Sequence, residues 1–156
     1  MTVLKLGLAA AVMAAVFGGA AVAAPATLTS VVMKETVTRD AEGHVVNALT
    51  PPVKITPGDH VVYVVTYKNG ATKPATGVVI TNPIPSNLEY TGFGDGPAPL
   101  VSTDNRVFAP LNQLKALHGG AEVMATPADV TAVQWVIADA IPPGGQARMS
   151  FRAKLK

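Results

Sequence analysis

The sequence predicts an all-β fold, an antiparallel immunoglobulin-like β-sandwich with an extended N-terminal strand. Segments rich in β-branched and aromatic residues recur at intervals of roughly 10 to 15 residues, with no long helical pattern between them. The 14 Gly and 13 Pro residues supply many chain reversals. Residues 147–156 alternate strictly between apolar and polar side chains, which is typical of a strand with one buried face and one solvated face.

Residues 1–23 have the pattern of a secretory signal peptide. Lys5 supplies the positive charge, an apolar run begins at Leu6, and Ala21 and Ala23 are small residues at the positions that a signal peptidase recognises. A membrane anchor is the competing interpretation, because the run approaches the roughly 20 apolar residues that span a bilayer. The cleavage site and the richness in Ala and Gly favour a cleaved signal. We therefore expect a secreted or cell-surface protein with no membrane span after cleavage.

The composition excludes several kinds of partner and site. Charged residues make up 14% of the chain, against roughly 25% in a typical soluble domain. The formal net charge is +2, and Lys5 leaves with the leader, so the mature domain is nearly neutral and has no basic field for nucleic acid. Because the chain has no Cys, its fold uses neither a disulfide nor a thiolate metal site.

The first part of the mature chain, residues 24–50, is predicted to be an extended segment that precedes a sandwich domain of residues 51–156. Residues 24–38 are rich in Thr and Val and contain no Gly, which is typical of a long strand. A charged turn and a short strand at 45–49 follow, and two prolines end this strand.

Residues 56–70 contain the central strand of the predicted fold. A Pro-Gly-Asp corner precedes it, and Asn-Gly ends it. Tyr63 and Val65 lie on one face and Val62 and Val64 on the other, so both faces are apolar. Each sheet of a lone antiparallel sandwich usually keeps one face solvated. The second apolar face is therefore covered either by residues 111–118 or another loop, or by a second copy of the protein.

The remaining strands follow from similar patterns of apolar residues between turn residues. They are predicted at 53–55, 77–81, 88–91, 130–138 and 147–155, with a hairpin at 101–108. Leucines at positions 111, 114 and 117 are compatible with two helical turns or with a loop pinned by leucines.

Four segments carry a family resemblance: Thr56 to Asn69, Val78 to Tyr90, Val101 to Leu111, and Ala128 to Leu155. In these segments the chain resembles the bacterial surface-protein repeat known as domain of unknown function eleven (DUF-eleven). The resemblance implies an immunoglobulin-like sandwich in an exported protein, with no shared catalytic residue. The chain differs from the family in having one copy, and in having Asn82 and Asp104-Asn105-Arg106 where the family often has Asp and Asp-Gly-Gly. These differences weaken any cation site in the acidic loops.

No side-chain pattern predicts an enzyme, a cofactor or a metal site. The three histidines, at positions 44, 60 and 118, are far apart and form no spaced ligand pair. Asp95, Asp104 and Asp129 could contribute to a Ca²⁺ loop, but no compact Asp-x-Asp pattern supports one. Nucleophile and zinc-hydrolase motifs are absent from the sequence. Trp135 alternates with Val133 and Ile137, which favours a core position over a sugar-stacking platform.

The function that these patterns favour is structural: an exported subunit of an extracellular or cell-surface fibre or layer, self-associating by β-strand addition. Residues 24–38 are the predicted donor strand, which would pair with an edge of a neighbouring copy. The predicted interface residues are Leu28, Val31, Val32, Met33, Val62 and Val64. The alternative is a monomeric secreted binding or adhesion module for a glycan or partner protein, which would use the loops at 92–99 and 111–120.

Overall fold

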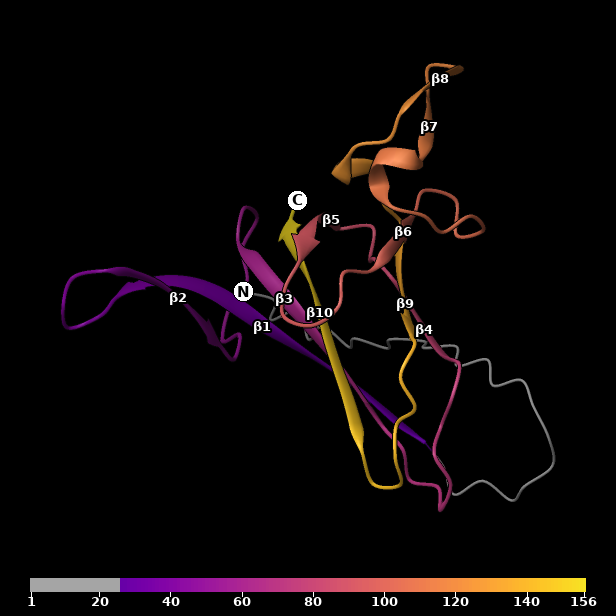
Figure 1. Ribbon diagram of the computed structural model, residues 1–156. Coiled ribbons are helices and arrows are strands. Elements are labelled where there is room, and N and C mark those ends of the chain that lie inside the picture. The colour runs from indigo at the N-terminus through magenta and orange to yellow at the C-terminus, as the bar shows by residue number, and fades with distance from the viewer. Residues whose placement is uncertain (1–25) are drawn as a thin grey trace, which may run out of the picture.

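The computed structural model describes residues 26–156, so the predicted signal peptide lies outside the described residues. The regular structure of the described chain is mostly β-strand in antiparallel sheets, with only two 3₁₀ turns, which confirms the predicted all-β sandwich (Figure 1). The immunoglobulin-like topology stays a prediction. Within residues 26–156, no helix is long and apolar enough to cross a membrane.

The larger sheet has five strands in the order β2-β1-β3-β10-β5. Their bounds are Val45–Thr50, Thr27–Arg39, His60–Lys68, Gln146–Leu155 and Leu88–Phe93, respectively. The central strand β3 pairs along most of its length with β1 on one side and with β10 on the other. The strand predicted from residues 56–70 is therefore at the centre of this sheet.

The smaller sheet has three strands in the order β4-β9-β6, with bounds Val78–Pro83, Ala132–Ile137 and Leu100–Ser102. The segment at 111–118 forms neither two helical turns nor a simple loop: it is one 3₁₀ turn, Leu111–Gln113, followed by β7 (Lys115–His118). β7 pairs with β8 (Ala121–Met124), and a second 3₁₀ turn, Pro127–Asp129, leads into β9. Figure 1 shows the β7–β8 hairpin projecting from the sandwich, well away from β1 and β2.

The core lies between the two sheets. Phe151 of β10 stacks on Tyr63 of β3, with ring centroids 4.8 Å apart, and is tilted towards Trp135 of β9 at 6.3 Å. Trp135 is 1% exposed, and its Nε1–H donates to the carbonyl of Pro97 at 3.1 Å. This confirms the prediction that Trp135 is a core residue.

The outer face of β3 is covered within the chain. Val62 and Val64 are only 3% and 8% exposed. Met33 and Val31 of β1 lie opposite them in the ladder, and the backbone at Gly94, after β5, lies so close that a Cβ there would collide with the Ser150 hydroxyl. The cover is therefore a neighbouring strand and the loop at 92–99. In the closed chain these two valines are therefore covered without a second copy.

β1 lies in the chain's own sheet, antiparallel to β3, from the pair Thr27–Lys68 to the pair Lys34–Val61. The predicted boundary at residue 50 is therefore corrected, because residues 27–39 are part of the sandwich. The physical reason is twofold. The backbone groups along the edge of β3 need hydrogen-bond partners, and a strand beside β3 also shields the apolar side chains on its two faces from water. A local sequence pattern does not specify which segment fills that place.

Ser30 on the inner face of β1 provides a test of this placement. It lies opposite Val65, and its Oγ is buried without a hydrogen-bond partner among the described residues. We expect Ser30→Ala to leave the free energy of unfolding unchanged or to raise it by about 1 kcal/mol, because an unsatisfied buried hydroxyl is removed. Urea denaturation measures the change. Ser150→Ala is the matched control: the Ser150 Oγ–H donates to the carbonyl of Asp95 at 2.9 Å, so this change should destabilise the protein.

Candidate assembly surface on the first strand

The strand β1 has two halves with different neighbours. Residues 27–33 pair with β3 on one edge, and no described residue pairs with their other edge. Residues 34–39 pair with β2, and beyond Lys34 they have no β3 partner, so the β1–β2 hairpin projects as a two-stranded arm (Figure 1). One strand therefore presents both an open edge and a protruding hairpin.

The six predicted interface residues divide between the two faces of the larger sheet. Leu28 and Val32 point to the inner face and pack against the core. The structure brings the other four together on the outer face, where Val31 lies opposite Val64 and Met33 opposite Val62. Of these four, Val31 is the most exposed, at 52%.

The outer apolar strip continues from Val31 onto the arm. Val37 is 70% exposed and Val45 is 59% exposed, and the register places both on the same face as Val31. Neither valine is among the six predicted interface residues. The alternation Val31, Met33, Glu35, Val37 is the signal that could have identified the first of them.

The open edge of β1 has none of the usual protection against pairing. Natural edge strands are protected by charged side chains, prolines, bulges or short length. Residues 27–33, Thr-Leu-Thr-Ser-Val-Val-Met, contain no charge, Pro or Gly, and their ladder with β3 is regular. Such an edge is available for another strand.

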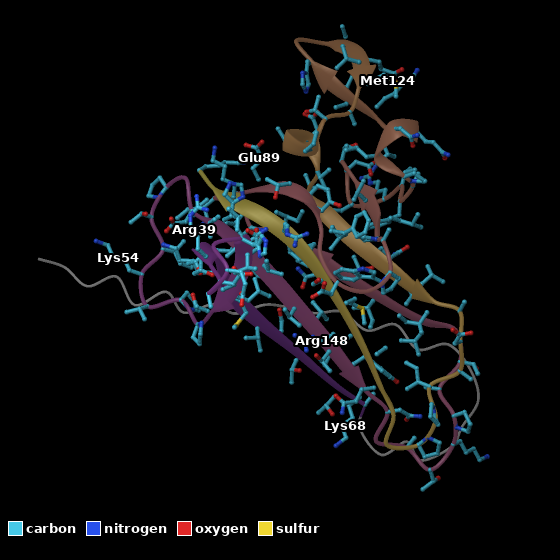
Figure 2. All side chains as sticks on the ribbon, turned by 60° about the vertical axis from the view of Figure 1, so that its left-hand side comes forward. Arg39, Lys54, Lys68, Glu89, Met124 and Arg148 are labelled. Carbon is cyan, nitrogen blue, oxygen red and sulfur yellow. The ribbon has the colours of Figure 1, made fainter. Side chains whose placement is uncertain are left out.

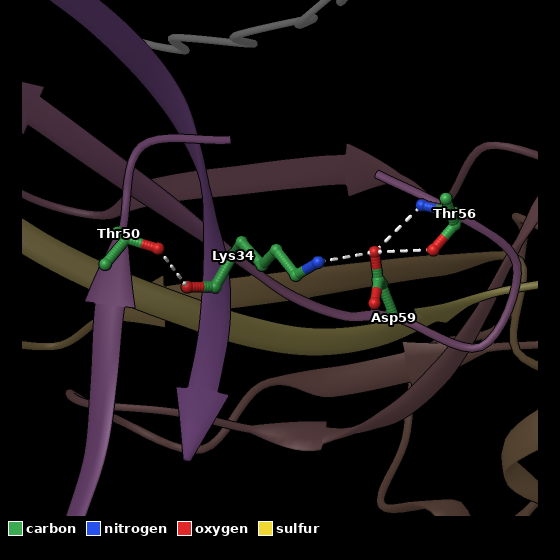
Figure 3. Close-up of polar contacts among 4 residues, drawn as sticks. All are labelled: Lys34, Thr50, Thr56 and Asp59. Atoms are coloured by element: carbon green, nitrogen blue, oxygen red, sulfur yellow. Dashed lines mark hydrogen bonds and ion pairs between the residues drawn. The ribbon is translucent and has the colours of Figure 1, made fainter. Parts of the chain in front are cut away.

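Two ion pairs fasten β1 to the rest of the sheet. The Lys34 Nζ lies 2.7 Å from Asp59 Oδ2, which also accepts bonds from the N–H of Thr56 at 2.8 Å and its Oγ at 3.1 Å (Figure 3). Glu35 Oε1 is 3.2 Å from the Nε of Arg152. Sequence reasoning missed these contacts, because each joins residues that are distant in sequence.

The Lys34–Asp59 pair makes the stability of the protein acid-sensitive. Hydrogen bonds from Lys34 and from the backbone of Thr56 lower the pKa of Asp59 from 3.8 to about 2. A carboxylate with a depressed pKa in the folded state stabilises that state above its unfolded pKa and loses this effect as the pH falls. We therefore expect the free energy of unfolding to decline from about pH 4 towards pH 2.

Urea denaturation at a series of pH values measures this decline, and the control variant is Asp59→Asn. The pKa of Asp129 is also about 2, chiefly because of the backbone N–H of Thr126 and the bond with His118, so the variant should keep part of the acid sensitivity. Equal declines in the variant and the parent protein would contradict a role for Asp59.

A cluster of Asp40, Glu42 and His44 lies at the tip of the arm, with potential ligand atoms within 4.8 Å of one another. All three residues belong to the turn between β1 and β2. Asp40 Oδ1 accepts hydrogen bonds from the backbone N–H groups of Glu42 and His44, at 3.1 and 2.8 Å. This geometry is that of an Asp-closed turn, which holds the two strands of the arm together.

A hollow of about 390 Å³ lies beside the β7–β8 hairpin. It is lined by Thr103, Asp104, Lys115, Ala116, Leu117, Glu122 and Asp129. The predicted loop at 111–120 thus contributes to it, whereas the loop at 92–99 does not.

The carboxylates of the hollow have partners within the protein. Asp104 Oδ1 accepts bonds from the backbone N–H groups of Arg106 and Val107, which lower its pKa. Asp129 Oδ1 is 2.6 Å from His118 Nε2. Asp95, the third residue weighed for Ca²⁺, does not line the hollow.

Comparisons of the chain with protein-family models, with curated proteins and with solved structures give no match. The functional interpretation therefore depends on the geometry of β1 and of the hollow.

Proposed function

We propose that this chain is an exported structural protein whose copies assemble into an extracellular or cell-surface fibre or layer by β-strand addition, with β1 as the joining strand. The observation that supports this most directly is the regular, uncharged edge of β1 at residues 27–33. The expected signal peptide and the resemblance to the DUF-eleven surface repeat agree with an exported structural role.

The energetics of strand addition suit this surface. Each added backbone hydrogen bond contributes about 1 kcal/mol net, so a ladder of several bonds supports specific association. The neighbouring outer face adds apolar area at Val31, Val37 and Val45. With charged residues at only 14% of the chain, repulsion between copies is weak.

The test of this proposal is the size of the mature protein, residues 24–156, measured by light scattering and negative-stain electron microscopy. We expect filaments or sheets whose mass increases with protein concentration. A synthetic peptide of residues 24–39, added in excess, should shorten these assemblies by occupying the same strand position, whereas a scrambled peptide of equal composition should not. A protein that stays monomeric at high concentration would overturn the proposal. Assemblies whose length does not change when the peptide is added would also overturn it.

The second candidate function is that of a monomeric binding module, and the hollow beside the β7–β8 hairpin favours it. Lys115 and Glu122 pair across its rim at 2.9 Å, and both side chains are 62% exposed. Leu117 and Met124 are also exposed on the hairpin, and Figure 2 shows Met124 at the projecting end of the molecule. Saturable binding to an oligosaccharide array by a monomer, lost in Lys115→Ala and retained in Lys54→Ala, would support this function over assembly.

A further inference from the structure

We infer that the copies join by exchange: the whole β1–β2 unit of one copy (residues 27–50, called the exchanging arm) leaves its own β3, and its β1 takes the identical place on β3 of a second copy. This inference rests on the proposed function, but it places the contact at a different site from the open edge of β1: the partner site is the β1-facing edge of another copy's β3. The segment at 51–55 acts as the hinge. Exchange of an identical element is a low-cost route to association, because the contacts of the closed chain are all remade.

The strands β1 and β2 are the least buried strands of their sheet. No residue of β1 or β2 is buried, whereas five consecutive residues of β3, from Val61 to Val65, are. The exchanging arm is also N-terminal to every other described strand, so it can leave without threading through the fold. Its detachment breaks one ladder and two ion pairs and leaves most of the core between β3, β10 and the smaller sheet in place.

The hinge at residues 51–55 is a mostly exposed segment without regular structure. Residues 51–55, Pro-Pro-Val-Lys-Ile, belong to no strand, and Val53 is fully exposed. Figure 2 shows Lys54 pointing away from the sheet. Backbone hydrogen bonding resumes only at the next turn, where the N–H of Asp59 donates to Thr56 at 3.0 Å and that of Gly58 to Leu155 at 2.8 Å. Consecutive prolines favour an extended backbone, so this hinge favours the reach that the open exchanging arm needs.

When β1 leaves, its place at the edge of β3 must be filled by another strand. Without β1, the edge of β3 would lose its ladder, and the inner-face contacts of Leu28 and Val32 with the core would be exposed to water. Only a strand with the same alternation of side chains restores both the ladder and these core contacts, and β1 of another copy has the same sequence. An exchanging arm donated onward from each copy to the next gives an open chain of copies rather than a closed pair.

A disulfide lock tests exchange directly, on a chain that contains no Cys of its own. Thr29 of β1 lies directly opposite Thr66 of β3, and Thr66 lies directly opposite Arg148 of β10. Opposed strand residues have Cα separations that suit a disulfide. The variant T29C/T66C, oxidised as a monomer, fixes the exchanging arm to its own β3. The matched control T66C/R148C fixes two strands that do not exchange.

We expect oxidised T29C/T66C to lose assembly and to regain it on reduction, while T66C/R148C assembles in both states. In a mixture of the single variants T29C and T66C, exchange should produce disulfides between different chains in the assembled fraction. The variant T29K should still assemble by exchange, because the side chain at position 29 stays on the exposed outer face. Edge-to-edge pairing of two β1 strands would instead be blocked by the added charge. Assembly of the locked protein at the parental rate, with no interchain disulfide in the mixture, would overturn exchange and leave the proposed function standing. A parental protein that never assembles overturns both.

Discussion

Replacing Phe151 by Ala is expected to lower the free energy of unfolding by about 3–5 kcal/mol, the typical cost of removing a large buried aromatic side chain. Phe151 is fully buried at the centre of β10, where it contacts the stacked ring of Tyr63 in its own sheet and the tilted ring of Trp135 in the smaller sheet. It therefore connects the two layers, and its loss leaves a cavity that neither sheet can close alone.

The matched control for this prediction is Phe93→Ala. Phe93 of β5 pairs directly with Phe151 in the ladder, yet it is 50% exposed at the edge of the sheet. Its truncation should cost only about 1 kcal/mol, because about half of the residue is already exposed to solvent. Guanidinium denaturation of both variants measures the difference. Equal costs for the two substitutions would contradict the placement of the core between the sheets.

The strands β3 and β10 could be predicted from the sequence because their signals are local. In β10 the alternation predicts which side chains face the core, and the structure confirms this: Met149, Phe151 and Ala153 are buried on the inner face. The other face is not fully solvated, because Ser150 is buried beneath the loop at 92–99. In β3 a Pro-Gly-Asp corner and an Asn-Gly pair bound a run of β-branched and aromatic residues. The alternation of side chains and the turn residues that bound the strand lie within a few residues of each other, so a short stretch of sequence is enough to predict the strand.

The position of β1 could not be predicted in the same way. The sequence indicates that residues 24–38 are extended, but extension is compatible with a place beside its own β3, beside another copy's β3 or at a free edge. The choice depends on pairing between residues separated by more than 30 positions, such as Thr29 with Thr66. The ion pair of Lys34 with Asp59 and the cover that Gly94 provides over Val62 depend on the same tertiary arrangement.

The candidate assembly surface was therefore only partly predictable. The six predicted interface residues do not share one face. Leu28 and Val32 pack against the core, and the other four lie on the outer face, where the two valines of β3 are covered. The features on which the proposed joining of copies depends are backbone features: an edge that no described residue pairs, a projecting hairpin and a proline-rich hinge. A list of apolar residues does not reveal them, because they become visible only when the sheet order is known.

Asn69 at the end of β3 is the second residue whose replacement should have a large effect. The side chain is 1% exposed, and its Nδ2 donates to the carbonyls of Lys73 at 2.9 Å and Ile141 at 2.8 Å, while its Oδ1 accepts the N–H of Ala71 at 3.0 Å. The backbone of Asn69 also bonds Gly144 and Gly145. One amide thus ties the end of the central strand to the two chain segments that lead into β4 and β10.

Asn69→Asp keeps the shape of this side chain but replaces a double donor by a carboxylate oxygen that faces two carbonyl oxygens. We expect a loss of about 3 kcal/mol or more in the free energy of unfolding at pH 7, because a buried charge is left without donors for one oxygen. The loss should shrink as the pH falls and the carboxyl group is neutralised, which urea denaturation at pH 7 and pH 4 measures. The exposed Asn112→Asp is the control and should cost little at either pH. If both substitutions cost the same, the amide of Asn69 does not hold the end of β3.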